Sequence, residues 1–144
     1  MQNDDSIVYS LHDQVDPKTV SVVDEGLGES NKQAAPIHLV RSLACFAKRY
    51  SDIVVGGAAG RTWGQCCELQ RLWVTEEFRR QGIGSRLVRL FEERAYSQGC
   101  RTFYLETFSF QSLDLYRSLG YEIKLEITGF PDGITKYVMV KLLE

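Results

Sequence analysis

The clearest hydrophobic pattern in the chain lies in residues 82–98. Its apolar side chains recur at steps of one, three or four residues, at Ile83, Leu87, Leu90, Phe91 and Ala95. Such steps place side chains on one face of an α-helix. Gly99 follows, where a left-handed residue commonly ends a helix. The pattern therefore predicts an amphipathic helix that packs against a core.

Residues 66–74 instead favour a β-strand, whose side chains point alternately to opposite faces. Regular alternation places Glu68, Gln70, Leu72 and Val74 on one face, and Cys67, Leu69, Arg71 and Trp73 on the other. Two apolar-rich segments precede this strand, residues 37–49 and 52–63, with short turns between them. The three segments predict antiparallel strands joined by hairpins.

The rest of the chain adds further elements. A helix is predicted over residues 16–31, because Asp16 suits the N-cap and Pro17 the first helical position. A short helix is predicted over residues 109–119, with Ser109 as its N-cap. Further strands are predicted over residues 6–11, 101–107, 121–127 and 134–143.

The predicted order is β-α-β-β-β-α-β-α-β-β. A chain of 144 residues fits one domain, and its sequence shows no repeat and no low-complexity segment. We therefore expect an α/β (α+β) fold, a mixed sheet with helices packed on it, as a single domain over residues 1–144.

Composition excludes several classes of function. Hydrophobic residues make up 44% of the chain and charged residues 25%, which is ordinary for a globular protein. The formal net charge of -2 argues against nucleic-acid binding, which usually needs a basic excess. No apolar run approaches the roughly 20 residues that span a bilayer, and the acidic, polar start does not read as a signal peptide. We expect a cytoplasmic protein without nucleic-acid or membrane partners.

The four cysteines are predicted to be free thiols in a reducing compartment. None of them forms a CxxC pair. Cys66 and Cys67 are adjacent on the predicted strand and point to opposite faces, so they do not readily share a metal ion. We expect no metal site.

Residues 79–86, RRQGIGSR, join the predicted strand to the amphipathic helix with two glycines and three arginines. The first backbone N–H groups of a helix lack intrahelical partners, and glycine lets a ligand approach them closely. The corner therefore suits a phosphate group, although a plain tight turn would use the same glycines. Two common nucleotide loops do not fit: Leu87 stands where GxGxxG needs its third glycine, and the P-loop's Gly-Lys-Ser/Thr is absent.

The corner does fit the pattern Arg/Gln-x-x-Gly-x-Gly/Ala. With LQRLWVTEEF before it, this segment resembles the acetyl-CoA-binding motif of the GNAT superfamily of N-acetyltransferases. Residues 105–122, LETFSFQSLDLYRSLGYE, resemble the strand–helix motif that closes the family's cofactor site. The matches cover residues 69–122, and the element order extends the resemblance over the chain. It implies the GNAT fold of a small bacterial-type member, a mostly antiparallel sheet of about six to seven strands flanked by about three to four helices.

The resemblance also implies a cofactor site for acetyl-CoA (coenzyme A), used as a co-substrate without a metal. Pantetheine would pair with the predicted strand like an added half-strand, with the Leu72 N–H as a donor to the thioester carbonyl. The pyrophosphate would bind the backbone amides of the glycine corner. The residues implied are Leu72, Trp73 and Val74 for pantetheine, and Arg79, Arg80, Gln81, Gly82, Ile83, Gly84 and Ser85 for pyrophosphate.

Tyr116 matches the family's tyrosine that donates a proton to the leaving thiolate, and a phenol is protonated at neutral pH. A tyrosine that merely packs under the sheet is the alternative. Ser109 stands where many members carry an asparagine that contacts the cofactor. Either Ser109 makes that contact, or it only caps the helix and Gln111 supplies an amide instead.

An amine must be neutral to attack, so a base or bulk water takes its proton. Glu68 is our predicted base, because it lies on the motif strand at an offset that some family members use. The alternative is a half-exposed strand glutamate without a catalytic role, with Glu106 and Glu122 as rival bases.

The function implied is acetyl-CoA-dependent N-acetyl transfer to a primary amine by direct attack in a ternary complex. Two alternatives stay open: a catalytically silent acyl-CoA-binding or regulatory module, and a protein acetyltransferase acting on a lysine or an N-terminus. The acceptor is therefore a small-molecule amine or a peptide amine. A homodimer is common in the family, and for this chain it stays open.

Overall fold

The computed structural model describes residues 6–50 and 52–144. The chain divides into two compact units, Met1–His38 and Leu39–Glu144. The single domain over residues 1–144 stays a prediction. None of the helices in the described residues is long and apolar enough to cross a membrane.

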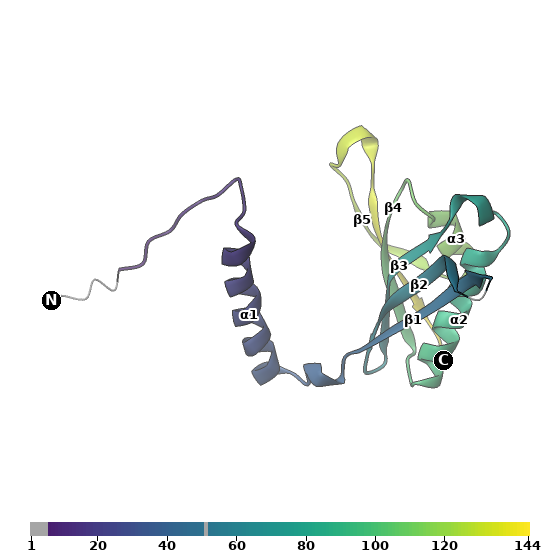
Figure 1. The fold of residues 1–144 in the computed structure, drawn as a ribbon, viewed down its shortest axis with the longest axis horizontal. Helices are drawn as coiled ribbons and strands as arrows, with labels where there is room; N and C mark the ends of the chain where they lie inside the picture. The colour runs from purple at the N-terminus through teal and green to yellow at the C-terminus, as the bar shows by residue number, and fades with distance from the viewer. Residues whose placement is uncertain (1–5, 51) are drawn as a thin grey trace. The chain divides into compact units, whose positions relative to one another are not determined.

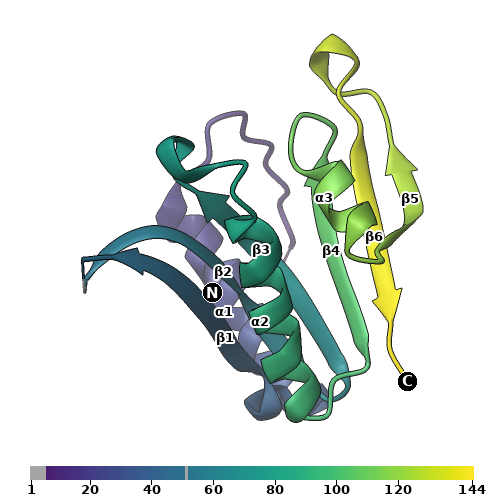
Figure 2. The ribbon, with the colours of Figure 1, turned by 90° about the vertical axis from the view of Figure 1, so that its right-hand side faces the viewer.

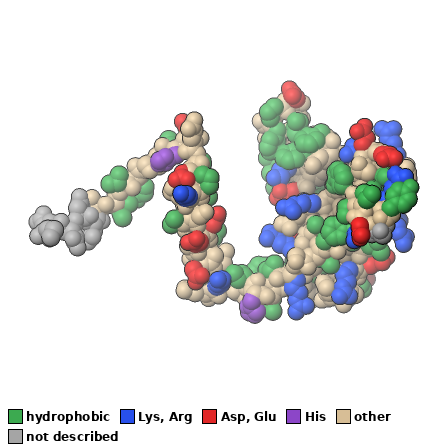
Figure 3. All heavy atoms as spheres, viewed as in Figure 1, with side chains coloured by type: hydrophobic (Ala, Val, Ile, Leu, Met, Phe, Trp, Pro, Cys, Tyr) green, Lys and Arg blue, Asp and Glu red, His purple; other side chains and the backbone are tan. Residues whose placement is uncertain are grey.

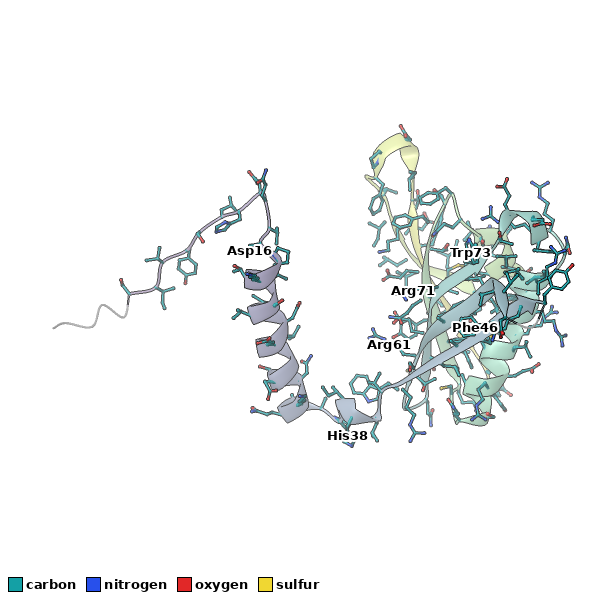
Figure 4. All side chains as sticks on the ribbon, viewed as in Figure 1. Asp16, His38, Phe46, Arg61, Arg71 and Trp73 are labelled. Carbon is teal, nitrogen blue, oxygen red and sulfur yellow. The ribbon has the colours of Figure 1, made fainter. Side chains whose placement is uncertain are left out.

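Helix α1, Pro17–Ala34, is the main element of the first unit (Figure 1). Asp16 caps it, as its position in Figure 4 shows, and its carboxylate accepts a hydrogen bond from the Lys18 N–H at 3.0 Å. Acidic and hydrophobic side chains both lie on the helix surface (Figure 3). The predicted helix is confirmed. The strand predicted over residues 6–11 is wrong, because a strand needs a neighbour for its backbone groups and the described part of this unit contains no other strand.

The second unit is built on one sheet of six strands. These are β1 (Arg41–Arg49), β2 (Ile53–Trp63), β3 (Cys66–Val74), β4 (Thr102–Phe108), β5 (Glu122–Ile127) and β6 (Lys136–Leu142). They lie in the order β1-β2-β3-β4-β6-β5 (Figure 2), with β3 and β4 parallel and the other pairs antiparallel. The mixed, mostly antiparallel sheet is therefore confirmed. β1 begins at Arg41 because residues 37–39 form a 3₁₀ turn.

Helices α2 (Ile83–Ser97) and α3 (Leu113–Ser118) lie on the same face of this sheet (Figure 2). The core forms between them and the inward side chains of the sheet, among which Phe103, Leu105 and Met139 are at most 1% exposed. The predicted apolar face of α2 is confirmed at Leu87, Phe91 and Ala95, which are buried. Leu90 lies at the edge of that face and is 41% exposed, whereas Val88 and Glu92 are buried instead.

A β-bulge interrupts the pairing of β2 with β3. Ala59 lies opposite Arg71 but the next residue, Gly60, lies opposite Leu69, so Gln70 is an extra residue on β3. A Cβ at Gly60 would overlap the backbone carbonyl of Glu68, so a glycine is required at this close approach.

The bulge changes which side chains of β3 share a face. Leu72 and Val74 pack against the core, whereas Arg71 lies with Arg61 on the sheet face away from α2 and α3 (Figure 4). The prediction that Glu68 shares a face with Leu72 is therefore wrong. Alternation holds from Cys66 to Leu69, but the extra residue reverses it for the rest of the strand.

Candidate active site

Strands β3 and β4 pair over only part of their length. Their parallel ladder ends at Leu69, opposite Leu105. Beyond that point β3 stays paired with β2 as far as Val74, while β4 follows β6 as far as Phe108. The two strands therefore diverge (Figure 2), and among residues 6–50 and 52–144 the β4-facing edge of β3 has no strand partner beyond Leu69.

A cleft of about 1240 Å³ lies over this divergence. Its walls come from the end of β3, the turn into α2, the end of β4, and α3. Every predicted cofactor-binding residue except Gln81 lines it: Leu72, Trp73, Val74, Arg79, Arg80, Gly82, Ile83, Gly84, Ser85, Ser109, Gln111 and Tyr116. The two sequence motifs thus form opposite walls of one cleft.

Hydrogen bonds at the end of β3 show which of its backbone groups face the cleft. The Thr75 N–H donates to the Val55 carbonyl at 2.7 Å, so Thr75 points towards β2. The Val74 carbonyl instead accepts from the Arg79 side-chain Nε at 2.8 Å. Since backbone groups alternate along a strand, Leu72 points its N–H and carbonyl to the same side as Val74. The edge can therefore pair with an extended, amide-containing ligand.

The glycine corner forms the other end of the cleft. Gly82 has φ 80° and caps the start of α2, and Arg80 is also left-handed, with φ 62°. The first helical hydrogen bond runs from the Arg86 N–H to the Gly82 carbonyl at 3.0 Å. The N–H groups of residues 83–85 therefore precede the helical ladder and stay available to an anion. Open backbone amides, with arginines beside them, fit a phosphate group.

A family model described as the acetyltransferase (GNAT) family matches residues 9–121. The chain belongs to the GNAT acetyltransferase family. The match spans well over half of the chain, and it includes the first motif, all but the last residue of the second, and the diverging strands β3 and β4.

Individual relatives agree with this assignment. Blasticidin-S acetyltransferase from Streptomyces morookaense is 33% identical over 112 residues, which are 77% of this chain and 80% of that protein. The crystal structure of an acetyltransferase from Bacillus cereus has a TM-score of 0.77 at 23% identity, covering 93% of this chain and 98% of that chain. The PaiA N-acetyltransferase of Thermoplasma acidophilum, solved in complex with coenzyme A, has a TM-score of 0.58 at 19% identity, covering 70% of this chain and 60% of that chain. The two structures show that the GNAT fold is shared.

Tyr116 lies on α3 and lines the cleft, with only 7% of its surface exposed. Within residues 6–50 and 52–144 its hydroxyl makes no hydrogen bond. Burial raises the pKa of Tyr116 to about 12, because an ionised phenolate would lose its hydration. The hydroxyl therefore keeps its proton at neutral pH, on a residue that lines the cleft of this GNAT domain.

Ser109 does not cap α3, so that prediction is wrong. The helix begins at Leu113, after Ser112. Ser109 is instead held by Thr135: its N–H donates to the Thr135 carbonyl at 2.8 Å, and its Oγ accepts from the Thr135 N–H at 3.0 Å. These two bonds fix the loop between β4 and α3 in a non-helical conformation, and Ser109 lines the cleft from that loop.

Gln111 is fixed by its own side-chain oxygen. That Oε1 accepts a hydrogen bond from the Phe108 N–H at 2.9 Å and one from the Thr107 hydroxyl at 3.3 Å. Both hydrogen bonds hold the amide oxygen of Gln111 against β4. The NH₂ group of the same amide is therefore left to donate to a ligand. The geometry fits the alternative in which Gln111 supplies the amide, and the role itself stays a prediction.

Glu68 lies outside the main cleft. It is half-buried on β3, and its Oε1 accepts from the Arg61 Nε at 3.0 Å. It lines a smaller pocket of about 340 Å³. The small pocket and the cleft therefore adjoin, because they share four lining residues: Leu69, Gln70, Glu106 and Gln111. The Glu68 carboxylate can therefore contact an acetyl-acceptor molecule that occupies the small pocket beside the cleft.

Sequence reasoning missed the apolar wall that α3 and its preceding loop contribute. Phe110, Leu113 and Leu115 line the cleft, and the Phe110 ring stacks on Phe108 with centroids 5.3 Å apart. The available signal was a second aromatic residue, Phe110, close after the predicted strand over residues 101–107, in TFSFQ. Among the described residues, no group of three or more His, Cys, Asp or Glu side chains could hold a metal ion. That no metal takes part stays a prediction.

Proposed function

We propose that this GNAT acetyltransferase moves the acetyl group of acetyl-CoA to a primary amine by direct attack in a ternary complex. The observation that carries the proposal is one cleft that joins the open amides of residues 83–85 to the unpaired edge of β3. The first feature suits a pyrophosphate and the second an extended chain with amides. Coenzyme A contains both groups, and the coenzyme A complex of the Thermoplasma relative supports the same assignment.

The residues divide this work between them. The α2 amides at Gly84 and Ser85 would hold the pyrophosphate, and the arginine side chains at the exposed rim would add orientation but little affinity, because water and salt screen them. Leu72 and Val74 would pair with the pantetheine amides, and the Leu72 N–H would donate to the thioester carbonyl. Bound acetyl-CoA supplies an acetyl group that its thioester activates for transfer.

Two side chains would handle protons. Tyr116 donates from within the cleft towards the leaving sulfur, since burial keeps its hydroxyl protonated. Glu68 accepts the proton of the amine from the adjoining pocket, either directly or through a water molecule. The main cleft and the small pocket then serve the donor and the acceptor separately.

We expect free thiol to be released from acetyl-CoA only when a suitable primary amine is present. A panel should include small-molecule amines and peptides with a lysine or a free N-terminus. Blasticidin S belongs in it because a relative 33% identical carries that name. If coenzyme A binds but none of the amines in the panel causes thiol release, the result would favour the silent module. Thiol release with peptides alone would favour a protein acetyltransferase.

We expect Glu68→Gln to lower kcat at pH 7 by about 10²-fold, the usual contribution of a general base. The deficit should shrink towards pH 10, because an amine with an ordinary pKa near 10.4 then becomes partly neutral without help. Initial rates of thiol release from pH 7 to 10 measure this change.

Glu122→Gln is the matched control for Glu68→Gln. Glu122 also forms an ion pair from a strand, with Lys124 at 3.0 Å, but it is exposed and lines neither pocket. The control should keep wild-type rates throughout. A Glu68→Gln deficit that is absent or does not change with pH would remove Glu68 as the base and leave that task to another group or to water.

A further inference from the structure

A buried charge cluster lies outside the residues that line the cleft. Glu92 on α2 is 5% exposed, and its carboxylate accepts from the Lys141 Nζ at 3.1 Å and from the Tyr121 hydroxyl at 3.2 Å. A buried carboxylate without partners would cost several kcal/mol, and these two partners satisfy it. Burial and the nearby Glu92 raise the pKa of Tyr121, so the Tyr121 hydroxyl stays protonated and keeps donating.

The cluster connects the two halves of the diverging sheet. Glu92 belongs to α2, which packs on β1, β2 and β3. Lys141 lies on β6, opposite Phe103 of β4, and Tyr121 directly precedes β5. Because β3 and β4 pair only as far as Leu69, few backbone bonds hold the halves together near the cleft. The Glu92 carboxylate therefore ties α2 to the far half of the sheet by side chains.

Tyr121, which donates to Glu92, also contacts Tyr116. The two rings pack edge to face, with centroids 6.0 Å apart and planes at 72°. The Tyr121 N–H also donates to the Tyr116 carbonyl at 3.0 Å. Both rings are buried, Tyr121 at 3% and Tyr116 at 7% exposure, so neither can turn without displacing the other.

We propose that Tyr121 is a positioning residue for Tyr116. Its hydroxyl, held by Glu92, fixes the Tyr121 ring, and that ring fixes the direction in which the Tyr116 hydroxyl meets the cleft. This inference rests on the proposed role of Tyr116 as proton donor. Tyr121 itself touches neither the donor nor the acceptor site, because it lines neither pocket.

A double-mutant cycle tests this coupling. Tyr121→Phe keeps the ring and removes only the hydrogen bond to Glu92. We expect it to lower kcat by about tenfold in the wild-type background, since small errors in orientation are costly. It should leave the KM for acetyl-CoA and the Kd for coenzyme A unchanged. In a Tyr116→Phe background the same change should cost nothing further, because no hydroxyl remains to be positioned.

Tyr96→Phe is the matched control. It also removes one hydrogen-bonded phenol, to the Glu144 carbonyl at 2.9 Å, but at the far end of α2 and outside both pockets. Its kcat should match the wild type. Glu92→Gln, checked for folding by its coenzyme A affinity, should lower kcat as Tyr121→Phe does, again only while Tyr116 is present.

The outcomes separate this inference from the proposed function. An equal loss from Tyr121→Phe in both backgrounds, or no loss in either, would overturn the positioning role while Tyr116 stays the donor. Wild-type kcat in Tyr116→Phe alone would instead overturn the mechanism on which the inference rests.

Discussion

We expect the double variant Gly82→Val/Gly84→Val to bind coenzyme A at least about 100-fold more weakly than the wild type. Gly82 has φ 80°, a conformation that costs a residue with a side chain roughly 1–2 kcal/mol. To escape that strain the chain would re-orient the amides of residues 83–85. Two lost hydrogen bonds to an ionised phosphate, at roughly 1.5–3 kcal/mol each, give the expected factor. Isothermal titration calorimetry with coenzyme A measures it.

The effect should be local because a Cβ at either position meets no crowding. A Cβ at Gly82 meets nothing within 4 Å, and one at Gly84 comes to 3.5 Å from the Leu115 side chain, an ordinary contact. Gly99→Val is the matched control. Gly99 has φ 104° beyond the other end of α2 and is equally uncrowded, so the control carries the strain but leaves the cleft alone. Coenzyme A binding that survives the double change undiminished, or that falls equally in Gly99→Val, would contradict the assigned phosphate site.

Local sequence signals predicted the elements that build the cleft. The glycines at its ends and the 3.6-residue period of its apolar side chains predict α2 to within one residue at each end. The two sequence motifs form opposite walls of the cleft. These signals succeed because they are local: a cap, a period and a left-handed glycine each act within a few residues. The strand over residues 6–11 failed for the opposite reason, since pairing depends on a neighbour that propensity does not encode.

Long-range features could not be read in this way. The bulge at Gln70 follows from how β2 and β3 pair, and it decides that Glu68 opens into the small pocket and not towards Leu72. Glu92 is charged, and charged side chains are almost never fully buried unless they are paired. It is buried because Lys141, on a strand 49 residues away, supplies its counter-charge. A single sequence does not reveal which distant residue will offset the desolvation cost of a buried carboxylate.

We expect Tyr116→Phe to lower kcat by roughly 10²-fold, the lower end of the range for a general acid. The lower end is expected because the pKa of Tyr116, about 12, lies about 3.5 pH units above the pKa of an ordinary thiol, near 8.5. Full proton transfer to a thiolate is then uphill, and a hydrogen bond to the developing charge does most of the work. The Kd for coenzyme A should not change, because the phenylalanine keeps the buried ring.

The raised pKa also predicts how this loss depends on pH. The protonated hydroxyl is the donating form, and a pKa raised to about 12 extends that form well above neutral pH. The ratio of wild-type to Tyr116→Phe kcat should therefore stay constant from pH 7 to 10. A tyrosine with an ordinary pKa near 10 would lose half of its contribution at pH 10. Parallel kcat measurements of both proteins across this range distinguish the two cases, and equal kcat values at pH 7 would remove Tyr116 from the mechanism altogether.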